Sequence, residues 1–493
     1  MSLSDSWTNR MRMAVERAPL WAGRLLAAMF LLAVLANLSR FVLKYLPRLG
    51  YQDWLAMSAY LGLLALVLWI CRRQTSPVRE SQIAGGLLAA SWVGKTVLAC
   101  WLSGIPQTAD RGFLLQFIDR WAAGGAAALP VLSREFFDYP LWAGRAWPFL
   151  YPLRLLFPER FVPATFCLNA FLSTLLAGGI YLVLRPYVRR PLVPLGLAVL
   201  SPALVWQVAE YGYQFQGALL LLAALFVLGR LSQALAGSSR FAWLWLAALA
   251  LAYFLLFLQR GLELVLLAVG LALAVYEALA ARSWRRLLRG GLAYAVVPLL
   301  LVHPAEKRVD GYFRQYDEGR LSSHFIGHMA MGWNLETWGE YYGPVVALDR
   351  RTPPERKTAV MLGYVAEQVR ARPFDALVKL PLVKLVKLFQ LGAASGAEDD
   401  LRAAGARAWW TAARATRLVF APLALGLAAL GAAGFFGRNG RAVFPWALLV
   451  LAFVAAYTFF SETSPRYSFY FQFVVLACAA EGLETLFGRR PAA

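Results

Sequence analysis

The chain has 493 residues, of which 60% are hydrophobic, 14% aromatic and only 16% charged, with a formal net charge of +21. Soluble proteins of this size do not carry so many apolar runs of about 18 residues or more, so the composition predicts an integral membrane protein. The runs are continuous rather than alternating, which favours helices over a β-barrel. The arginines cluster between apolar runs, where they set topology and contact anionic lipid head groups, so no nucleic-acid partner is indicated.

The apolar runs predict an all-α polytopic membrane protein with a bundle of about twelve transmembrane helices. The predicted spans are residues 20–42, 53–71, 82–102, 162–184, 191–209, 214–232, 241–258, 262–281, 288–303, 412–436, 442–460 and 467–486. The segment before residue 20 lacks the short apolar core and small-residue cleavage site of a signal peptide. We therefore expect it to be a cytoplasmic amphipathic lead-in to the first span.

Basic residues predict the sides of the membrane. Arginines concentrate in CRRQTSPVR, RPYVRRP, ARSWRRLLR and GRNGR, whereas the alternate connections YGYQFQ, LQRGLE and SETSPRYS contain at most one each. The positive-inside rule then makes both termini cytoplasmic. We expect three regions: a bundle over 1–303 with an extracytoplasmic loop at 103–160, an extracytoplasmic cap with an interfacial helix over 304–411, and C-terminal membrane helices over 412–493.

Lys95 interrupts the third predicted span. A lysine near the bilayer centre costs about 2.5–3.5 kcal/mol on insertion scales. Two interpretations stay open: Lys95 faces a polar cavity with an acidic partner, or the span is shifted and Lys95 lies nearer an interface.

The 103–160 loop carries acidic residues among aromatics and prolines, at a surface where anionic lipids favour basic residues. Solvation or pairing with Arg111, Arg120, Arg134 or Arg145 would explain Asp119 and Glu135. Asp110 follows the third span immediately, which makes it the stronger candidate for a functional carboxylate, with Asp138 second.

The 304–411 segment ends in ALVKLPLVKLVKLFQLG, in which Lys379, Lys384 and Lys387 punctuate an apolar run. Three lysines argue against a full span and favour an interfacial helix that contacts lipid phosphates; whether 376–391 spans or lies on the membrane stays open.

Metal and nucleotide motifs are weak or missing. The histidines are His303, His324 and His328, and HFIGH lacks an acidic third ligand at a fixed spacing, so a structural or substrate-contacting pair is favoured over zinc. No DxD pair occurs, so a divalent metal is unsupported and no cofactor is expected. The four cysteines show no CxxC spacing and are interpreted as apolar packing residues.

The chain has no GxxxxGK[ST] motif and no GxGxxG motif in a strand–helix context, and its cytoplasmic loops are short. A group-transfer enzyme on the outer face would therefore use a lipid-linked donor.

The order of several short motifs resembles the bacterial GT-C glycosyltransferases that use polyprenyl-phosphate sugars, which are related to protein O-mannosyltransferases and lipid A aminoarabinose transferases. The motifs are TADRGF with Asp110, the FIDRWAAGG helix, REFFDYPLW with Asp138, VLRPYVRRP, VLSPALVWQVAEYGYQ, LQRGLELVL, MGWNLETWGEYYG, ARPFDALVKLPLVK and ETSPRY with Arg466. The resemblance runs from about residue 82 to the end. Two features depart from it: three spans instead of one precede the acidic loop, and Arg111 stands where a second acid is expected.

The resemblance implies a membrane glycosyltransferase of the bacterial inner membrane that transfers a sugar with inversion from a polyprenyl-phosphate donor to a lipid, glycan or protein acceptor. Such a reaction needs a general base and cations that stabilise the leaving phosphate. Asp110 is the expected base, and Asp138 the second candidate. Cation candidates near the outer interface are Arg260, Arg466, Lys307, Arg308 and Lys384. Candidates that line a sugar or acceptor pocket are Glu210, Gln214, Trp333, Trp338, Tyr341 and Tyr342.

Each candidate has an ordinary alternative. The cations anchor lipid head groups equally well, and the aromatics fit an interfacial belt. Two other functions also stay open. A transporter or lipid flippase predicts broken spans and mid-membrane charges such as Lys95. An O-antigen ligase or polymerase would rely on basic residues and histidine rather than on an acid in the first loop.

Overall fold

The structure, a computed structural model, describes residues 3–73, 76–105, 109–128, 150–209, 214–237, 239–260, 262–314, 324–340, 342–390, 401–461 and 465–487. These residues form helices joined by turns, and no β-strand occurs within those ranges. In the same ranges, nine helices are long and apolar enough to cross a membrane. The chain is therefore an all-α polytopic membrane protein, as the composition predicts.

The bundle is built from the two ends of the chain and its middle. Its N-terminal helices are α1 (Leu3–Arg40), extended by η1 (Phe41–Tyr45) and η2 (Leu46–Arg48), α2 (Tyr51–Arg72) and α3 (Pro77–Leu102). The middle helices are α8 (Phe161–Leu184), α9 (Leu192–Leu200), α10 (Pro202–Trp206), η4 (Gln207–Ala209), α11 (Gln214–Ala236), α12 (Ala242–Arg260), α13 (Glu263–Ala281), α14 (Trp284–Gly291), η5 (Leu292–Val296) and α15 (Val297–Arg314). The C-terminal helices are α21 (Arg407–Asn439), η7 (Gly440–Ala442), α22 (Phe444–Ala455), η8 (Ala456–Phe460), η9 (Pro465–Phe471) and α23 (Gln472–Phe487).

All twelve predicted spans coincide with helical structure, but three of them are not single long helices. The segment predicted at 191–209 is broken between Leu200 and Pro202, and its two parts meet at 53°. The segments predicted at 241–258 and 442–460 correspond to shorter apolar helices, Ala242–Leu258 and Phe444–Phe459. The first span is longer than predicted, because the helical run Met13–Arg48 extends beyond both ends of 20–42. Length and hydropathy thus support nine membrane-spanning helices among the described residues, and the count of twelve spans stays a prediction.

Side chains cap the backbone groups that the broken span exposes. The Tyr60 hydroxyl donates to the Leu200 carbonyl (2.8 Å), and the Ser173 hydroxyl donates to the Leu204 carbonyl (2.6 Å). The Asn169 amide donates to the Val208 carbonyl (3.3 Å). Pro202 at the start of α10 prevents a continuous helix, because it has no N–H to donate. Partners on α2 and α8 therefore allow this backbone to leave the helical pattern inside the bundle.

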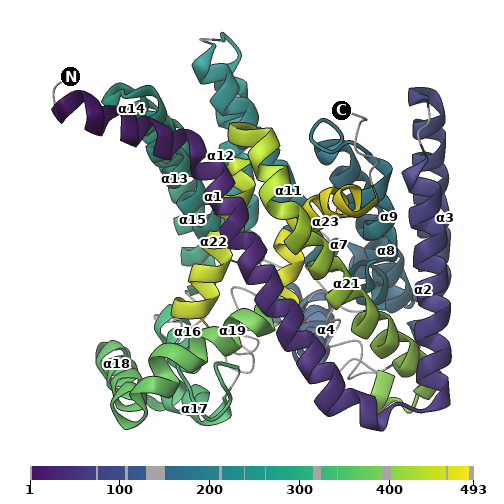
Figure 1. Cartoon of the computed structure of the whole chain (residues 1–493). Helices are drawn as coiled ribbons and strands as arrows, with labels where there is room; N and C mark the ends of the chain where they lie inside the picture. Colours follow the sequence, from purple (N-terminus) through teal and green to yellow (C-terminus); the bar gives the residue numbers. More distant parts are fainter. Residues whose placement is uncertain are drawn as a thin grey trace.

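Helix α23 is the central helix of the bundle. In the most apolar stretch of the α23 segment 83% of the residues are buried, whereas in that of the α3 segment, at the edge of the bundle, 17% are buried (Figure 1). Helix α21 lies between α1 and α23 and has its most extensive contacts with these two helices. A Cβ added at Gly431 would collide with the Cys478 carbonyl oxygen, and one at Gly482 with the Leu427 carbonyl oxygen. The backbones of α21 and α23 approach closely because both positions are glycine.

The two ends of the bundle differ. Both chain termini and α14 lie at one end, and α4 (Ala109–Gly124) and the helices α16 to α19 lie at the other (Figure 1). At the terminal end, arginines of the basic connections pair with acids near the ends of α3 and α23. Arg190 meets Glu484 at 2.9 Å, Arg185 meets Glu80 at 3.1 Å, and Arg438 pairs with Glu481. These arginines thus bind the protein itself, a use that the topology rule does not predict.

We call residues 324–390 the cap and the end of the bundle where they lie the cap end. The cap comprises α16 (His324–Gly332), α17 (Gly343–Arg351), α18 (Pro354–Ala371), η6 (Asp375–Lys379) and α19 (Leu380–Leu388). Its small apolar core is formed by Ala330, Met331, Val345, Val346 and Met361. Helix α19 connects the cap to the bundle, because Phe389 just after it packs edge-to-face against Phe30 of α1 (5.4 Å) and Phe471 of η9 (5.5 Å).

The close approach of α21 and α23 predicts that Gly431→Ala lowers stability by about 1–3 kcal/mol, because the added methyl group separates the two backbones. Thermal unfolding of the detergent-purified protein measures the change. Gly426→Ala on the same helix is the matched control, since its Cβ would meet no atom within 4 Å. Equal destabilisation by both variants would contradict this packing.

Candidate functional site

Lys384 is the most deeply buried cation at the cap end, with a relative exposure of 0%. Its ammonium donates to the Gly332 carbonyl (3.0 Å) at the end of α16 and to the Ser461 carbonyl (2.8 Å) just after η8. One side chain thus ties the cap to a C-terminal helix of the bundle. For Lys384 this contradicts the expected contact with lipid phosphates, because the chain surrounds its side chain.

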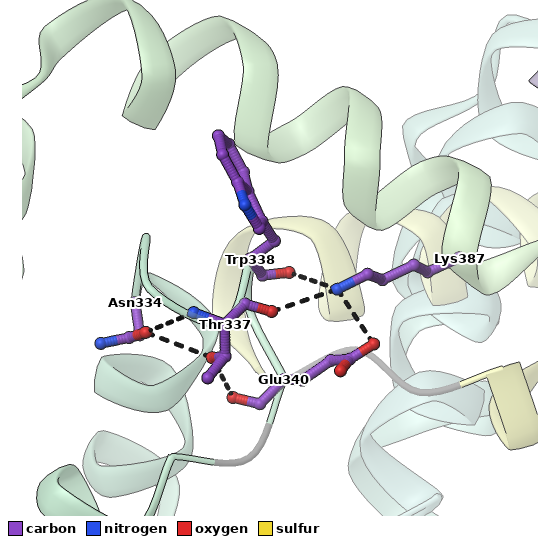
Figure 2. A network of polar contacts seen from close by, with 5 residues as sticks. All are labelled: Asn334, Thr337, Trp338, Glu340 and Lys387. Atoms are coloured by element: carbon purple, nitrogen blue, oxygen red, sulfur yellow. Dashed lines mark hydrogen bonds and ion pairs between the residues drawn. The ribbon is translucent and has the colours of Figure 1, made fainter. Parts of the chain in front are cut away.

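A second lysine of α19 organises the loop between α16 and α17. The Lys387 ammonium donates to the Thr337 (3.2 Å) and Trp338 (3.0 Å) carbonyls and forms an ion pair with Glu340 (3.0 Å), as Figure 2 shows. Asn334 folds the loop from the other side, because its Oδ1 accepts from the Thr337 backbone N–H (2.9 Å) and hydroxyl (3.2 Å). The loop 333–340 is therefore held by polar contacts rather than by apolar packing alone.

The backbone of this loop fits only one residue type at its tightest position. Gly339 has φ +77°, a conformation that glycine adopts readily. A Cβ there would also lie 2.9 Å from both the Gly332 carbonyl oxygen and the Lys384 Cδ. Gly339 therefore allows the loop to pass directly over Lys384.

The aromatic candidates of the cap are partly fixed. The Trp333 indole donates to the Phe459 carbonyl (2.8 Å), and the Lys379 ammonium lies 4.6 Å from the centre of the Trp338 ring. Both tryptophans are half-buried. Tyr342 precedes α17, is half-buried and packs against the cap core, so its ring has a structural role that sugar stacking does not require. Tyr341 lies outside the described residues.

A partly buried hydrogen bond links α18 to the same loop. The Asn334 amide donates to the Tyr364 hydroxyl. Burial raises the pKa of the Tyr364 phenol above its ordinary value, so this hydroxyl stays neutral. A neutral phenol at this position accepts the Asn334 hydrogen bond without adding a charge beside the loop.

Three segments that carry sequence candidates converge beside the cap. Helix α19, with Lys384, contacts η9, which contains Arg466, and η9 also contacts α11, whose first residue is Gln214. Gln214 is buried. A Cβ at Gly217 of α11 would lie 2.9 Å from the Tyr470 ring and 3.3 Å from Leu262, so the end of α12 that bears Arg260 lies near this group. The structure describes only the backbones of Arg260 and Arg466.

The remaining candidates divide into two groups. Lys307 and Arg308 are exposed on α15. Asp110 is the second residue of α4, and the structure describes its backbone but not its side chain. Asp138 and Glu210 lie outside the described residues. Asp119 of α4 pairs with Arg154 (2.7 Å) of α7 (Leu150–Leu156), which is none of the four arginines that the sequence suggested as partners.

Lys95 is buried within the bundle, with 3% exposure, and donates to the Ser173 hydroxyl (2.7 Å). The partner that the structure describes is thus a hydroxyl and not the acidic group of the first interpretation. Lys95 lies seven residues before the cap-end terminus of α3, about 10 Å along the helix. The midpoint of α3 is about 8 Å away, so Lys95 lies nearer the middle of the span than this end.

Metal ligands do not gather in the part of the chain that the structure describes: no group of three or more His, Cys, Asp or Glu residues is found there. His328 is half-buried on α16, and the His324 side chain is outside the description.

Sequence reasoning missed the buried lysine. Ala376, Leu380 and Leu388 are buried at helical spacing, and Lys384 occupies the remaining position of this series. That spacing was the available signal, because it places Lys384 on the inward face. The carbonyls that it binds come from segments 52 and 77 residues away in sequence, and no local pattern reveals them.

In comparisons with known protein families and with curated proteins, none matches this chain. The site's geometry and the residues that form it therefore carry the functional argument.

Replacing Lys384 with Met should loosen the cap. The variant leaves two carbonyls without their donor, and an unsatisfied buried group costs about 1–3 kcal/mol. We expect a lower melting temperature and faster amide hydrogen exchange in 333–340.

Lys379→Met is the comparison for this variant, because Lys379 also meets the loop, at the Trp338 ring (4.6 Å), but from an exposed position paired with Asp375 (3.7 Å). Such pairs contribute roughly 0–1 kcal/mol. Unchanged exchange in the Lys384 variant would refute the role of Lys384 in holding the loop.

Proposed function

We propose that this protein is a membrane glycosyltransferase that transfers a sugar, with inversion, from a polyprenyl-phosphate donor to an extracytoplasmic lipid, glycan or protein acceptor. The observation that carries the proposal is that α19, which binds the loop 333–340, contacts η9, and that η9 in turn contacts α11. These segments bring a basic helix, aromatic side chains and buried amides to one end of a membrane bundle. A lipid-borne phosphate and its sugar require these groups together at a membrane surface.

In this proposal all twelve apolar segments cross the bacterial inner membrane and both termini are cytoplasmic. The cap end then faces the extracytoplasmic side, where polyprenyl-linked sugars are used. Support comes from the arginine pattern of the connections and from the position of both termini at the end opposite the cap (Figure 1).

The chemistry assigns one role to each group. The Asp110 carboxylate takes the proton of the acceptor hydroxyl as the acceptor oxygen attacks the anomeric carbon. The bond from that carbon to the phosphate oxygen breaks, and polyprenyl phosphate leaves with the electron pair. Arg260 and Arg466 stabilise the phosphate, because a guanidinium binds phosphate oxygens bidentately. Lys307 and Arg308 are secondary cations, and Asp138 orients the loop or binds sugar.

We assign Lys384 and Trp333 supporting roles in this mechanism. Both side chains bind backbone carbonyls at the junction of cap and bundle. We assign them to positioning the segments that bear the site, while Gln214, Glu210, Trp338, Tyr341 and Tyr342 remain candidates for sugar or acceptor contact.

The test of the proposal is Asp110→Asn in an assay with a defined polyprenyl-phosphate sugar. We expect kcat to fall about 10²–10⁴-fold, the usual contribution of a general base. Asp119→Asn on the same helix is the matched control, since an amide oxygen can still accept from Arg154. Undiminished transfer by the Asp110 variant would exclude this mechanism.

A transporter or lipid flippase is the second candidate, favoured by the buried Lys95 and by the broken span at 192–209. A flippase would move a fluorescent lipid-linked sugar from one leaflet of a proteoliposome membrane to the other. The Lys95→Met variant would lose this movement, and the Thr96→Ala variant would keep it. For a glycosyltransferase we expect lipid movement no faster than in protein-free liposomes. An O-antigen ligase or polymerase would tolerate Asp110→Asn, so the assay above separates it from the leading proposal.

A further inference from the structure

Two cysteines from different helices meet near the cap end of the bundle. The sulfur of Cys100 on α3 lies 3.9 Å from the sulfur of Cys167 on α8, which is van der Waals contact. Cys100 is exposed, and Cys167 is half-buried. The other two cysteines, Cys71 and Cys478, are buried, with exposures of 1% and 0%. Packing in the core therefore accounts for Cys71 and Cys478 but not for the pair at the surface.

The register between α3 and α8 brings the two sulfurs together. Lys95 of α3 donates to Ser173 of α8 (2.7 Å), which fixes one point of this interface. Cys100 stands five residues after Lys95, and Cys167 stands six residues before Ser173. Between antiparallel helices, positions displaced by similar steps in opposite directions lie opposite each other. The sulfur contact thus continues an interface that a buried hydrogen bond already aligns.

Helix α3 lies at the edge of the bundle, and its cap end leads toward the candidate site. In its most apolar stretch only 17% of the residues are buried. At the terminal end Glu80 pairs with Arg185, which follows α8 (3.1 Å). At the cap end α3 stops at Leu102, and α4, with Asp110 as its second residue, follows in the chain. A covalent bond at Cys100 would therefore fix the place from which the chain leaves toward α4.

Both cysteines lie toward the membrane surface at the cap end. Cys100 is two residues from the end of α3, or about 3 Å, and Cys167 is six residues from the start of α8, or about 9 Å. Trp101 beside Cys100 is 69% exposed, as is typical of the aromatic belt at a membrane interface. In the topology proposed above, this end faces the extracytoplasmic side, where disulfides form and persist. A small oxidant can reach the pair there.

We infer that Cys100 and Cys167 are a redox modification site that closes to a disulfide between α3 and α8. The more exposed Cys100 thiolate attacks one sulfur of a disulfide oxidant, and the oxidant's other sulfur leaves as a thiol. The Cys167 thiolate then attacks the Cys100 sulfur of this mixed disulfide, which forms the new bond and releases the second thiol. The pair loses two electrons and two protons, and the oxidant gains them.

The geometry leaves a short movement to complete this bond. Bonded sulfurs are about 2.05 Å apart, so the two must approach by about 1.9 Å. Each cysteine has staggered positions about its Cα–Cβ bond, and the approach falls to side-chain rotation. Bond formation does not depend on the proposed glycosyltransferase activity, so either can fail without the other.

The full-length protein in detergent, reduced and then freed of reductant, tests the site on treatment with dipyridyl disulfide, a small apolar disulfide oxidant. We expect two thiopyridone molecules per chain and an intact mass lower by two hydrogens, because no pyridyl group stays bound. Peptide mapping should find the Cys100 and Cys167 peptides linked, and a reductant should separate them. Cys71 and Cys478 should react at least about tenfold more slowly, since burial shields them.

Variants separate the pair from the buried cysteines. Cys100→Ser should release one thiopyridone and keep a pyridyl group on Cys167. The matched control Cys71→Ser/Cys478→Ser removes the two buried thiols, and we expect it to form the linked peptides as the unchanged chain does.

Three outcomes would overturn the inference: a lasting pyridyl adduct on Cys100 of the unchanged chain, a disulfide between two chains, or loss of the linked peptides in the folded control variant. Should a variant unfold, peptide mapping of the unchanged chain decides by itself.

Discussion

Hydrocarbon offers no hydrogen-bond partner, so each polar group that this chain places within the bundle needs one from the protein. The broken span at 192–209 depends on this condition. Tyr60, Ser173 and Asn169 supply donors to its carbonyls, and Lys95 in turn donates to Ser173. Without these side chains the break at Pro202 would leave backbone groups facing a medium that cannot solvate them.

The same requirement explains the junction of cap and bundle. Lys384 is completely buried, and its ammonium is accommodated because carbonyls of Gly332 and Ser461 receive its protons. A cation that binds two distant segments constrains both, since moving either one leaves a buried charge poorly solvated. Lys387 repeats this arrangement at the surface, where Glu340 and two carbonyls fix the loop. The cap is thus held by its lysines as well as by its small apolar core.

The outward surface of the bundle is not uniform. Most of the outward surface is apolar, as the exposed leucines and tryptophans of α2 and α3 show. A cavity between α1 and α21 is different, because Arg40 and Arg417 line it beside the π-helical turn at 41–45 and Pro422 of α21.

The sequence by itself determined the helical class, the positions of the membrane segments and the separation of basic from non-basic connections. Apolar length and the arginine pattern carry this information locally, which is why each predicted span meets helical structure. For Asp119 local patterns left solvation and pairing open, and its partner Arg154 was not among the arginines they suggested.

Only the tertiary structure decided which residues meet. The pairs Lys95–Ser173, Asp53–Arg414 and Lys384–Ser461 join positions 77 to 361 residues apart. Hydropathy assigned the lysines of α19 to the lipid surface because it averages over all faces of a helix. Packing assigned Lys384 to the interior, because only the folded chain brings carbonyl groups to that face.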